Sequence, residues 1–256
     1  MKNFKEPIFL VSFRSALCNY EIFVNNLPAY THFEGGSVSS QIPINQLIFE
    51  SGKQEIKIRI IPLKGESTFQ NDSLIEIKVI SYDSTTTDYD NTTESFNFIM
   101  DDLETHKIPI IQKNDYFLAE VPYKLKKLNS FDEIKDKKGL IISFYKEIYM
   151  LFKKQDVQKI YNLLKFRFDQ IDEATYSTKS DNVVGLTKLM ARLKEGEFEL
   201  KEFPTNPNII IYENKKICNL VRENKEPILY FLNKQNNEFS FPLLLSFENS
   251  KPIFIR

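Results

Sequence analysis

The chain has 256 residues, of which 42% are hydrophobic and 27% are charged. This composition is typical of a folded globular protein and excludes wholesale disorder and low-complexity scaffolds, while the length suits one large or two ordinary domains. The 34 basic and 35 acidic residues give a net charge of -1, so no long-range field attracts nucleic acid or anionic lipid. We therefore expect no nucleic-acid partner. The longest apolar runs are too short to span a bilayer, so we also expect no membrane span.

Residues 1–123 are predicted to form an antiparallel β-sandwich. Apolar and polar side chains alternate there with a period of two, most clearly in Gln54–Ile60, where isoleucines share one face and charged residues the other. A sheet with one solvent-exposed face is typical of antiparallel strand pairing. Further strands are predicted near residues 20–25, 75–79, 96–100 and 116–121, and a series of short strands joined by turns favours a sandwich.

A charged connector is predicted at 124–138, and the periodicity then becomes helical. Apolar side chains at helical spacing predict a helix over 141–152 and a second over about 157–175, with Asp156 as its N-cap. A third helix is predicted over 182–194, with Val183, Leu186, Leu189, Met190 and Leu193 facing inward.

The rest of the chain is predicted to contain strands only. They lie at 208–212, 217–221, 228–232, 238–246 and 251–255, separated by short polar turns, which indicates an antiparallel meander. The second domain, 139–256, is therefore predicted to be α+β, with three helices packed on one face of a curved antiparallel sheet.

Two stretches of the chain carry a family resemblance. The helical segments Ile141–Tyr149 and Asp156–Leu164, followed by a short helix and a meander, resemble a nuclear-transport-factor-like cone domain over roughly residues 135–256. The front half, with Glu21–Asn26, Gly35-Gly36, Pro43–Asn45 and Ser51–Ile58, resembles an immunoglobulin-like sandwich. The whole looks like a two-domain bacterial family of unknown function. Some proteins of this general build are similar to immunity partners of contact-dependent or type VI secreted toxins, and this implies binding to a toxin or effector protein.

The sequence offers little for catalysis. Only His32 and His106 are present, and no GxSxG elbow, GxGxxG or P-loop accompanies them. We therefore expect a protein that binds rather than catalyses, with no catalytic residues, metal or cofactor. A small-molecule carrier or enzyme using the pocket of the cone domain is the alternative, and an envelope carbohydrate-binding accessory is a third reading.

Two sets of candidate site residues follow from these readings. A stretch of acidic residues between two predicted strands suits a basic partner protein, and also has a hard-cation character without the central glycine of a calcium loop. The partner-binding candidates are Asp83, Asp88, Asp90, Glu94, Asp101 and Asp102. Polar and aromatic residues on the two long helices are candidates for lining a cone pocket, namely Tyr145, Tyr149, Asp169 and Asp172.

The two cysteines, Cys18 and Cys218, fall in different predicted domains. Both are expected to be free core residues, with one long-range disulfide as the alternative if the protein is exported. The N-terminal segment does not have the pattern of a signal peptide. We therefore expect a cytoplasmic protein as the sequence stands, or a periplasmic one if a leader has been removed.

Overall fold

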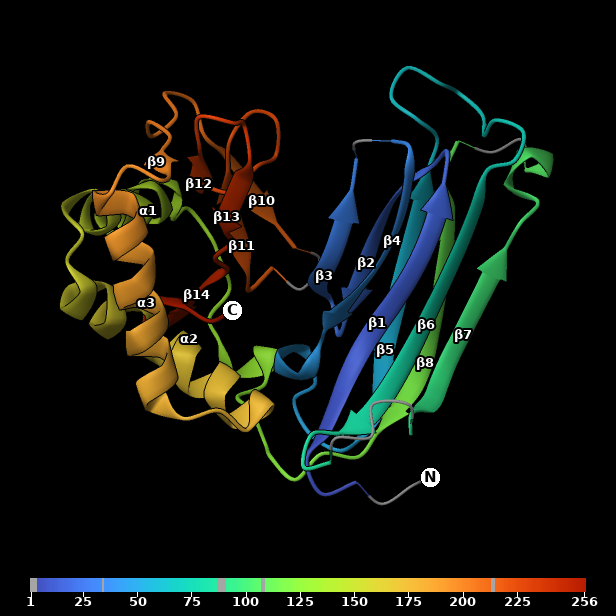
Figure 1. Cartoon of the computed structure of the whole chain (residues 1–256), viewed down its shortest axis with the longest axis horizontal. Helices are drawn as coiled ribbons and strands as arrows, with labels where there is room; N and C mark the ends of the chain where they lie inside the picture. Colours follow the sequence, from blue (N-terminus) through green and yellow to red (C-terminus); the bar gives the residue numbers. More distant parts are fainter. Residues whose placement is uncertain (1–3, 34, 87–90, 107–108, 213–214) are drawn as a thin grey trace. The chain divides into compact units, whose positions relative to one another are not determined.

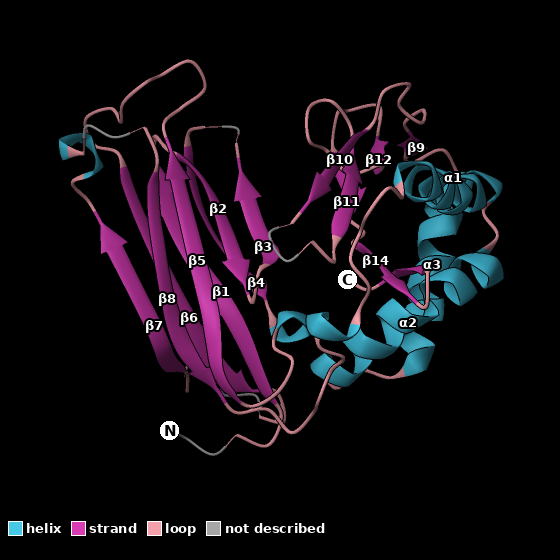
Figure 2. Cartoon of the chain, turned by 180° about the vertical axis from the view of Figure 1, so that it is seen from behind, coloured by secondary structure: helices cyan, strands magenta, loops and turns pink. Residues whose placement is uncertain are grey.

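The computed structural model describes residues 4–33, 35–86, 91–106, 109–212 and 215–256. Its contacts divide the chain into two compact units, Met1–Leu125 and Lys126–Arg256. Among the described residues, long strands fill the first unit, whereas the α-helices and a set of short strands belong to the second (Figures 1 and 2). The α+β class predicted from the sequence is confirmed, and the paired strands are antiparallel.

Two four-stranded sheets build the first unit, with the orders β4-β1-β6-β7 and β3-β2-β5-β8 (Figure 1). The strands of the first sheet are β4 (Ser37–Pro43), β1 (Pro7–Ala16), β6 (Leu74–Asp83) and β7 (Thr93–Met100). Those of the second are β3 (Leu27–His32), β2 (Asn19–Val24), β5 (Gly52–Ile61) and β8 (Ile111–Ala119). Short 3-10 turns, η1 (Asn45–Leu47) and η2 (Leu103–Thr105), lie in the connections.

Alternating side chains explain why the two sheets pack face to face. The three isoleucines of β5, Ile56, Ile58 and Ile60, are fully buried. Aromatic rings from the two sheets meet in the same core, as where Phe13 of β1 stacks on Tyr30 of β3 with ring centroids 4.3 Å apart. One residue of the predicted solvent-exposed face is more buried than expected. Lys57 is only 8% exposed, and its Nζ lies 4.9 Å from the ring centroid of Phe23.

The second unit begins with the helices α1 (Lys138–Lys154), α2 (Val157–Thr175) and α3 (Lys179–Lys194), preceded by the 3-10 turn η3 (Leu128–Ser130). The predicted N-cap of α2 is confirmed, because Asp156 accepts a hydrogen bond from the backbone N–H of Lys159 at 3.1 Å. Helix α3 begins three residues earlier than predicted, at a turn where the Asp181 carboxylate accepts from the N–H and hydroxyl of Thr178.

The predicted burial of one α3 residue, Val183, is wrong. Helix α3 packs against α2 and buries Leu186 and Met190, but Val183 is 37% exposed. Leu189 and Leu193 are partly buried and pack against the same core, so only the first residue of the predicted apolar stripe lies outside it.

The strands of the second unit form two sheets rather than the predicted single meander. Their orders are β10-β11-β14-β15 and β13-β12-β9. The first sheet contains β10 (Asn208–Ile211), β11 (Cys218–Val221), β14 (Leu245–Glu248) and β15 (Lys251–Phe254), and the second β13 (Glu238–Phe241), β12 (Leu229–Leu232) and β9 (Glu199–Leu200). The predicted strand 238–246 is split between two sheets at Pro242, which has no N–H to donate to a ladder.

The predicted connector 124–138 lies almost entirely within the second unit. The backbone N–H of Asp132 donates to the carbonyl of Phe247, and that of Ile134 to the carbonyl of Lys215, each at 2.8 Å. Phe131 and Ile134 are both buried. This segment is therefore packed structure and not a solvated linker.

Cys18 and Cys218 are free, and each is fully buried in its own unit. The alternative of a disulfide between them is not found. Burial raises the pKa of both thiols to about 12, which keeps them protonated near neutral pH. Within the described part of the chain, no helix is both long and apolar enough to cross a bilayer.

Candidate binding cleft

Strands β7 and β8 are the last strands of their sheets, and they lie along the same side of the first unit (Figures 1 and 2). Residues of both strands line shared cavities. We call β7, β8 and the described residues between them the β7–β8 margin. Because each sheet ends here, the outward backbone groups of both strands have no further strand of their sheet to pair with.

The β7–β8 margin holds every exposed large hydrophobic side chain found among the described residues of the first unit. These are Ile99, Ile110, Tyr116 and Leu118, with exposed fractions of 57%, 41%, 52% and 48%. On β8, Tyr116 and Leu118 alternate with the buried Phe117, so the pleat of the strand directs them away from the core. Exposed apolar residues scattered singly are ordinary, so the restriction of these four to one margin makes that margin a candidate interaction surface.

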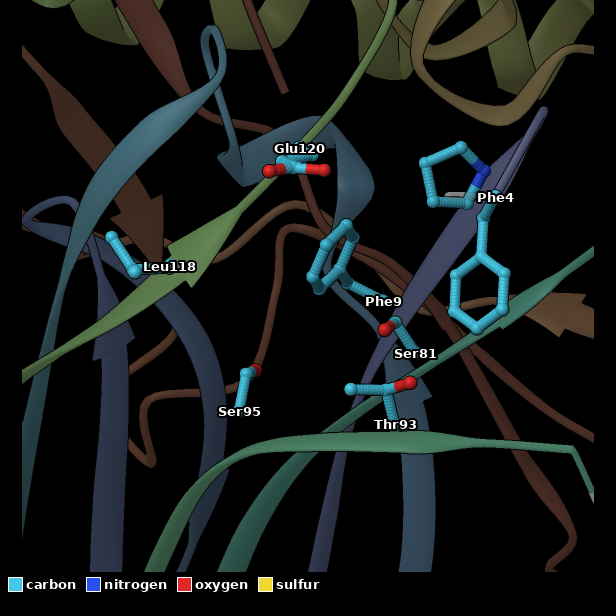
Figure 3. A pocket seen from close by; sticks show the side chains of 8 residues that line it. Phe4, Phe9, Ser81, Thr93, Ser95, Leu118 and Glu120 are labelled. Carbon is cyan, nitrogen blue, oxygen red and sulfur yellow. The ribbon is translucent and has the colours of Figure 1, made fainter. Parts of the chain in front are cut away.

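Two adjoining cavities lie in this margin. A small one of about 30 Å³ is lined by Phe4 and by residues of β1, β6, β7 and β8 (Figure 3). In Figure 3, Phe4 and Phe9 lie on one side of it and Ser95 and Leu118 on the other. The larger one, of about 290 Å³, is lined by Lys53, Thr93, Glu94, Ser95, Tyr116, Phe117 and Leu118. The two cavities share Thr93, Ser95 and Leu118, so together they form a cleft between the two strands.

Charged side chains frame the larger cavity. The Nζ of Lys53 lies 3.6 Å from the centroid of the Tyr116 ring, a cation–π contact that holds this exposed ring in place. Glu94 accepts a hydrogen bond from the Asn97 amide at 3.2 Å and lies 4.0 Å from the Nζ of Lys78. The lining of the larger cavity therefore combines apolar side chains, such as Phe117 and Leu118, with the charged Lys53 and Glu94.

The predicted partner-binding acids do not form one patch. Thr93 pairs with Ser81, whereas Met100 pairs with Ile75, so the two ends of β7 are separated by the length of the strand, roughly 25 Å. Asp83 and Glu94 lie near one end, and Asp101 and Asp102 follow the other. The acids therefore flank β7 at both ends. The remaining candidates, Asp88 and Asp90, lie outside the described residues, as does part of the predicted hard-cation stretch.

Asp83 has a structural role in holding the chain. Its carboxylate accepts hydrogen bonds from the backbone N–H groups of Lys5, Glu6 and Thr85, at 2.7, 3.3 and 3.0 Å, and from the Thr85 hydroxyl at 2.8 Å. These donors, led by the Lys5 amide, lower its pKa from 3.8 to about 2.

The predicted pocket residues of the second unit lie in its core and on α2. Tyr145 and Tyr149 are buried in the core, where the Tyr145 hydroxyl donates to the carbonyl of Leu243 at 2.6 Å and its ring lies 5.3 Å from that of Phe254. Burial raises the pKa of Tyr145 well above its ordinary value. Asp169 forms an ion pair with Lys165 of its own helix, and the buried Asp172 accepts from Asn182 of α3. Aromatic rings, Phe254 for Tyr145 and Phe203 for Tyr149, pack against the two tyrosines.

The second unit instead has an open cleft that sequence reasoning missed. It measures about 630 Å³ and is lined by Lys201, Pro204, Thr205, Asn206, Arg222, Glu223, Asn224, Glu226, Tyr230 and Leu232. Its wall is organised by Arg222, whose guanidinium donates to the carbonyls of Lys201, Glu202, Pro227 and Ile228 at 2.9–3.3 Å. Pro227 and Ile228 are near Arg222 in sequence, but Lys201 and Glu202 are about 20 positions away, so the local pattern alone does not predict the cleft.

No group of histidine, cysteine and acidic side chains within the described ranges has an arrangement that holds a metal ion. Comparison with known proteins adds no assignment, because no family model, no curated protein and no solved structure matches this chain. Function must therefore be inferred from the two units themselves.

Proposed function

We propose that this chain is a non-enzymatic protein-binding module whose partner binds at the β7–β8 margin. The observation that carries the proposal is the confinement of Ile99, Ile110, Tyr116 and Leu118 to that margin. Protein interfaces combine a dry centre of aromatic and aliphatic side chains with a polar, charged rim. The margin has this composition, with Glu94, Asp101 and Asp102 as its acidic rim.

An immunity protein that neutralises a secreted toxin by covering it is the form of this function that we propose. Occlusion requires shape and charge complementarity, and it needs no catalytic group. A two-sheet unit followed by an α+β unit is compatible with the immunoglobulin-like and cone-like build that the sequence resembles. The filled core around Tyr145 and Tyr149 weighs against the alternative of an enzyme or carrier using a cone pocket.

The proposal is tested by affinity capture from lysate of the source cells. The bait is the tagged chain, and the test variant carries Ile99→Ser, Tyr116→Ser and Leu118→Ser. A matched control variant carries Leu140→Ser, Met150→Ser and Val184→Ser, which replaces exposed hydrophobic residues of the second unit with exposed fractions of 51%, 44% and 49%. Both variants remove three exposed apolar side chains, so non-specific hydrophobic binding to the bait decreases equally in the two.

We expect the intact chain and the control variant to capture the same stoichiometric protein, and the margin variant to lose it. Capture that survives in the margin variant, or that is lost only in the control, would place the interface elsewhere. Capture of no protein by any of the three baits would contradict a protein-binding role.

The open cleft of the second unit favours a second candidate function, small-molecule binding. Its volume of about 630 Å³ falls in the range of ligand pockets, and hydroxyl, amide and carboxylate groups converge on it. A small molecule retained in native mass spectra of the purified chain, and lost in an Asn206→Ala and Glu226→Gln variant, would support this second candidate.

A further inference from the structure

The four edge strands of the first unit differ in how well they are protected against pairing with another chain. Edge strands are normally blocked by proline, by charges or by bulges. Strand β3 contains Pro28 and a register shift, β4 ends at Pro43, and β8 carries the ion pair of Lys113 and Asp115, whose Nζ and carboxylate oxygen are 3.0 Å apart.

Strand β7 has few of these protections. Over its 8 residues, Thr93–Met100, it contains no proline and a single charged residue, Glu94, and its register shift lies at that same end. The stretch from Phe96 to Met100 is apolar except for Asn97. Strand β7 is therefore the edge of the first unit that is best suited to accept another strand.

Side chains on both faces of β7 are left partly uncovered. Phe98 and Met100 pair with the buried Ile77 and Ile75, so they point toward the core, yet both are only half-buried because the sheet ends beside them. Ile99 points the other way and is 57% exposed. One added strand would cover these three side chains and pair the outward backbone groups of β7.

Charge at the ends of β7 specifies the occupant. Glu94 lies at the start, and Asp101, Asp102 and Glu104 follow the end. Lys78 lies 4.0 Å from Glu94 but is closer to Glu76, with a Nζ–Oε1 distance of 2.7 Å. Lys53 also lines the same cavity as Glu94. The described residues that follow β7 are therefore acidic, the start of the strand carries charges of both signs, and the centre of the edge is apolar.

We propose that β7 accepts an extended segment of a partner protein as an additional strand, and that this segment carries Lys or Arg at the end that meets Asp101 and Asp102. This inference rests on the proposed protein-binding function and names the mode of that binding. Main-chain hydrogen bonds supply the affinity in such strand addition, and alternate side chains supply the specificity.

A second copy of this chain fits the edge poorly. Antiparallel pairing of two β7 strands brings Glu94 of each copy to the end that carries Asp101 and Asp102 in the other. Like charges placed side by side across a pair of strands are destabilising. A basic partner segment meets the same carboxylates with opposite charge, so charge complementarity selects it over self-pairing.

The test uses the full chain labelled with ¹⁵N and three capped peptides of the same length as β7. The probe peptide has lysine at both ends and alternating valine and threonine between them. In one control peptide glutamate replaces both lysines, and in the other proline replaces a central valine. Binding is followed by amide chemical shifts and by hydrogen exchange of residues 93–100.

We expect the lysine peptide to slow exchange at the outward amides of β7, and the glutamate peptide to bind about tenfold more weakly at low salt. The proline peptide should bind more weakly still, because it lacks a donor for the ladder. The variant Ile99→Lys should abolish binding of the lysine peptide. Its matched control, Ile211→Lys, alters an isoleucine that is 49% exposed in the second unit and should leave binding unchanged.

Unchanged exchange at β7 with the lysine peptide present would overturn strand addition, and so would equal binding of all three peptides. A dimer detected by light scattering and abolished by Ile99→Lys would identify a second copy as the occupant and reject the basic segment.

If capture from lysate depends on the margin while β7 exchange is unaffected by the peptide, protein binding stands and only strand addition fails. If the lysine peptide protects β7 but capture from lysate does not depend on the margin, strand addition stands and the proposed protein-binding function at the margin fails.

Discussion

At the scale of single residues, Asp83 shows how a carboxylate that suits a binding surface can serve the fold instead. Its oxygens accept bonds from Lys5, Glu6 and Thr85, so it fastens the N-terminal segment to the end of β6. The sequence places Asp83 in a stretch between two predicted strands, whereas it is the last residue of β6, and its partner Lys5 is 78 positions away. Local pattern cannot reveal such a partner.

The lowered pKa of Asp83 predicts a specific dependence of stability on pH. The folded-state pKa of about 2 lies below the ordinary value of 3.8. The ionised form is therefore favoured by folding, so its stabilisation is complete above about pH 4 and is lost as the pH falls toward 2. We expect Asp83→Asn to lower the melting temperature at pH 7 and to reduce the difference in stability between pH 4 and pH 2.

Thermal melts of the intact chain and the variant across that pH range measure both effects. Asp102→Asn is the control, because Asp102 is exposed and its side chain caps no N–H of η2. An Asp83→Asn variant that melts like the Asp102→Asn control at every pH would show that the bonds to Lys5, Glu6 and Thr85 contribute nothing.

At the scale of elements, what the sequence reveals depends on whether the deciding interaction is local. The strand centred on Ile58 and the N-cap at Asp156 follow from short-range alternation and from capping chemistry, and both are found. The split of the predicted strand 238–246 into β13 and β14 follows from which strands pair. Pairing is decided by contacts between distant segments, although Pro242 was a local sign of the break.

In the candidate site, too, some features depend on local sequence and others on contacts between distant segments. The positions of Asp83, Glu94, Asp101 and Asp102 beside strand ends were predictable from periodicity. Their separation by a strand length was not, because it depends on the register of β7 against β6.

Helix α3 is predicted to be the least stable helix of the second unit. It buries Leu186 and Met190 but leaves Val183 and Val184 exposed, so little apolar contact opposes local unfolding. Its first turn relies on the Asp181 carboxylate, which accepts from Thr178. Asp181→Ala should therefore destabilise α3 by about 1 kcal/mol.

Hydrogen exchange resolved by residue provides the measurement. We expect the α3 amides to exchange faster than those of α1 and α2 in the intact chain, and faster again in Asp181→Ala, with α1 unchanged. Lys188→Ala, an exposed position of the same helix, is the control and should have little effect. Equal acceleration in all three helices would mean that the unit opens as a whole.

At the scale of the whole chain, each unit has its own hydrophobic core. The core of the second unit draws all its buried members from residues 134–254, and it joins the helices to both small sheets. The core of the first unit contains inward-facing residues of both larger sheets, such as Phe13 and Ile58. A unit with a complete core is expected to fold without the rest of the chain.

The boundary between the units gives the sharpest test of this organisation. Fragments 1–125 and 126–256 should each unfold cooperatively. A fragment 139–256, cut at the boundary that the sequence suggests, lacks the buried Phe131 and Ile134 and their backbone bonds to Phe247 and Lys215. Loss of a buried aromatic side chain alone costs about 3 kcal/mol or more, so this shorter fragment should be much less stable than 126–256.

Calorimetry and urea titration of the three fragments decide the matter, with the midpoint and the slope of each urea transition compared. A fragment 139–256 that unfolds at the same urea concentration as 126–256 would show that residues 126–138 only tether the two units. A lower midpoint is expected instead, because Phe131 packs edge-on against the ring of Phe166, with centroids 6.2 Å apart, and its removal exposes that face of α2 to water. The segment between the units would then be the first structural element of the second unit.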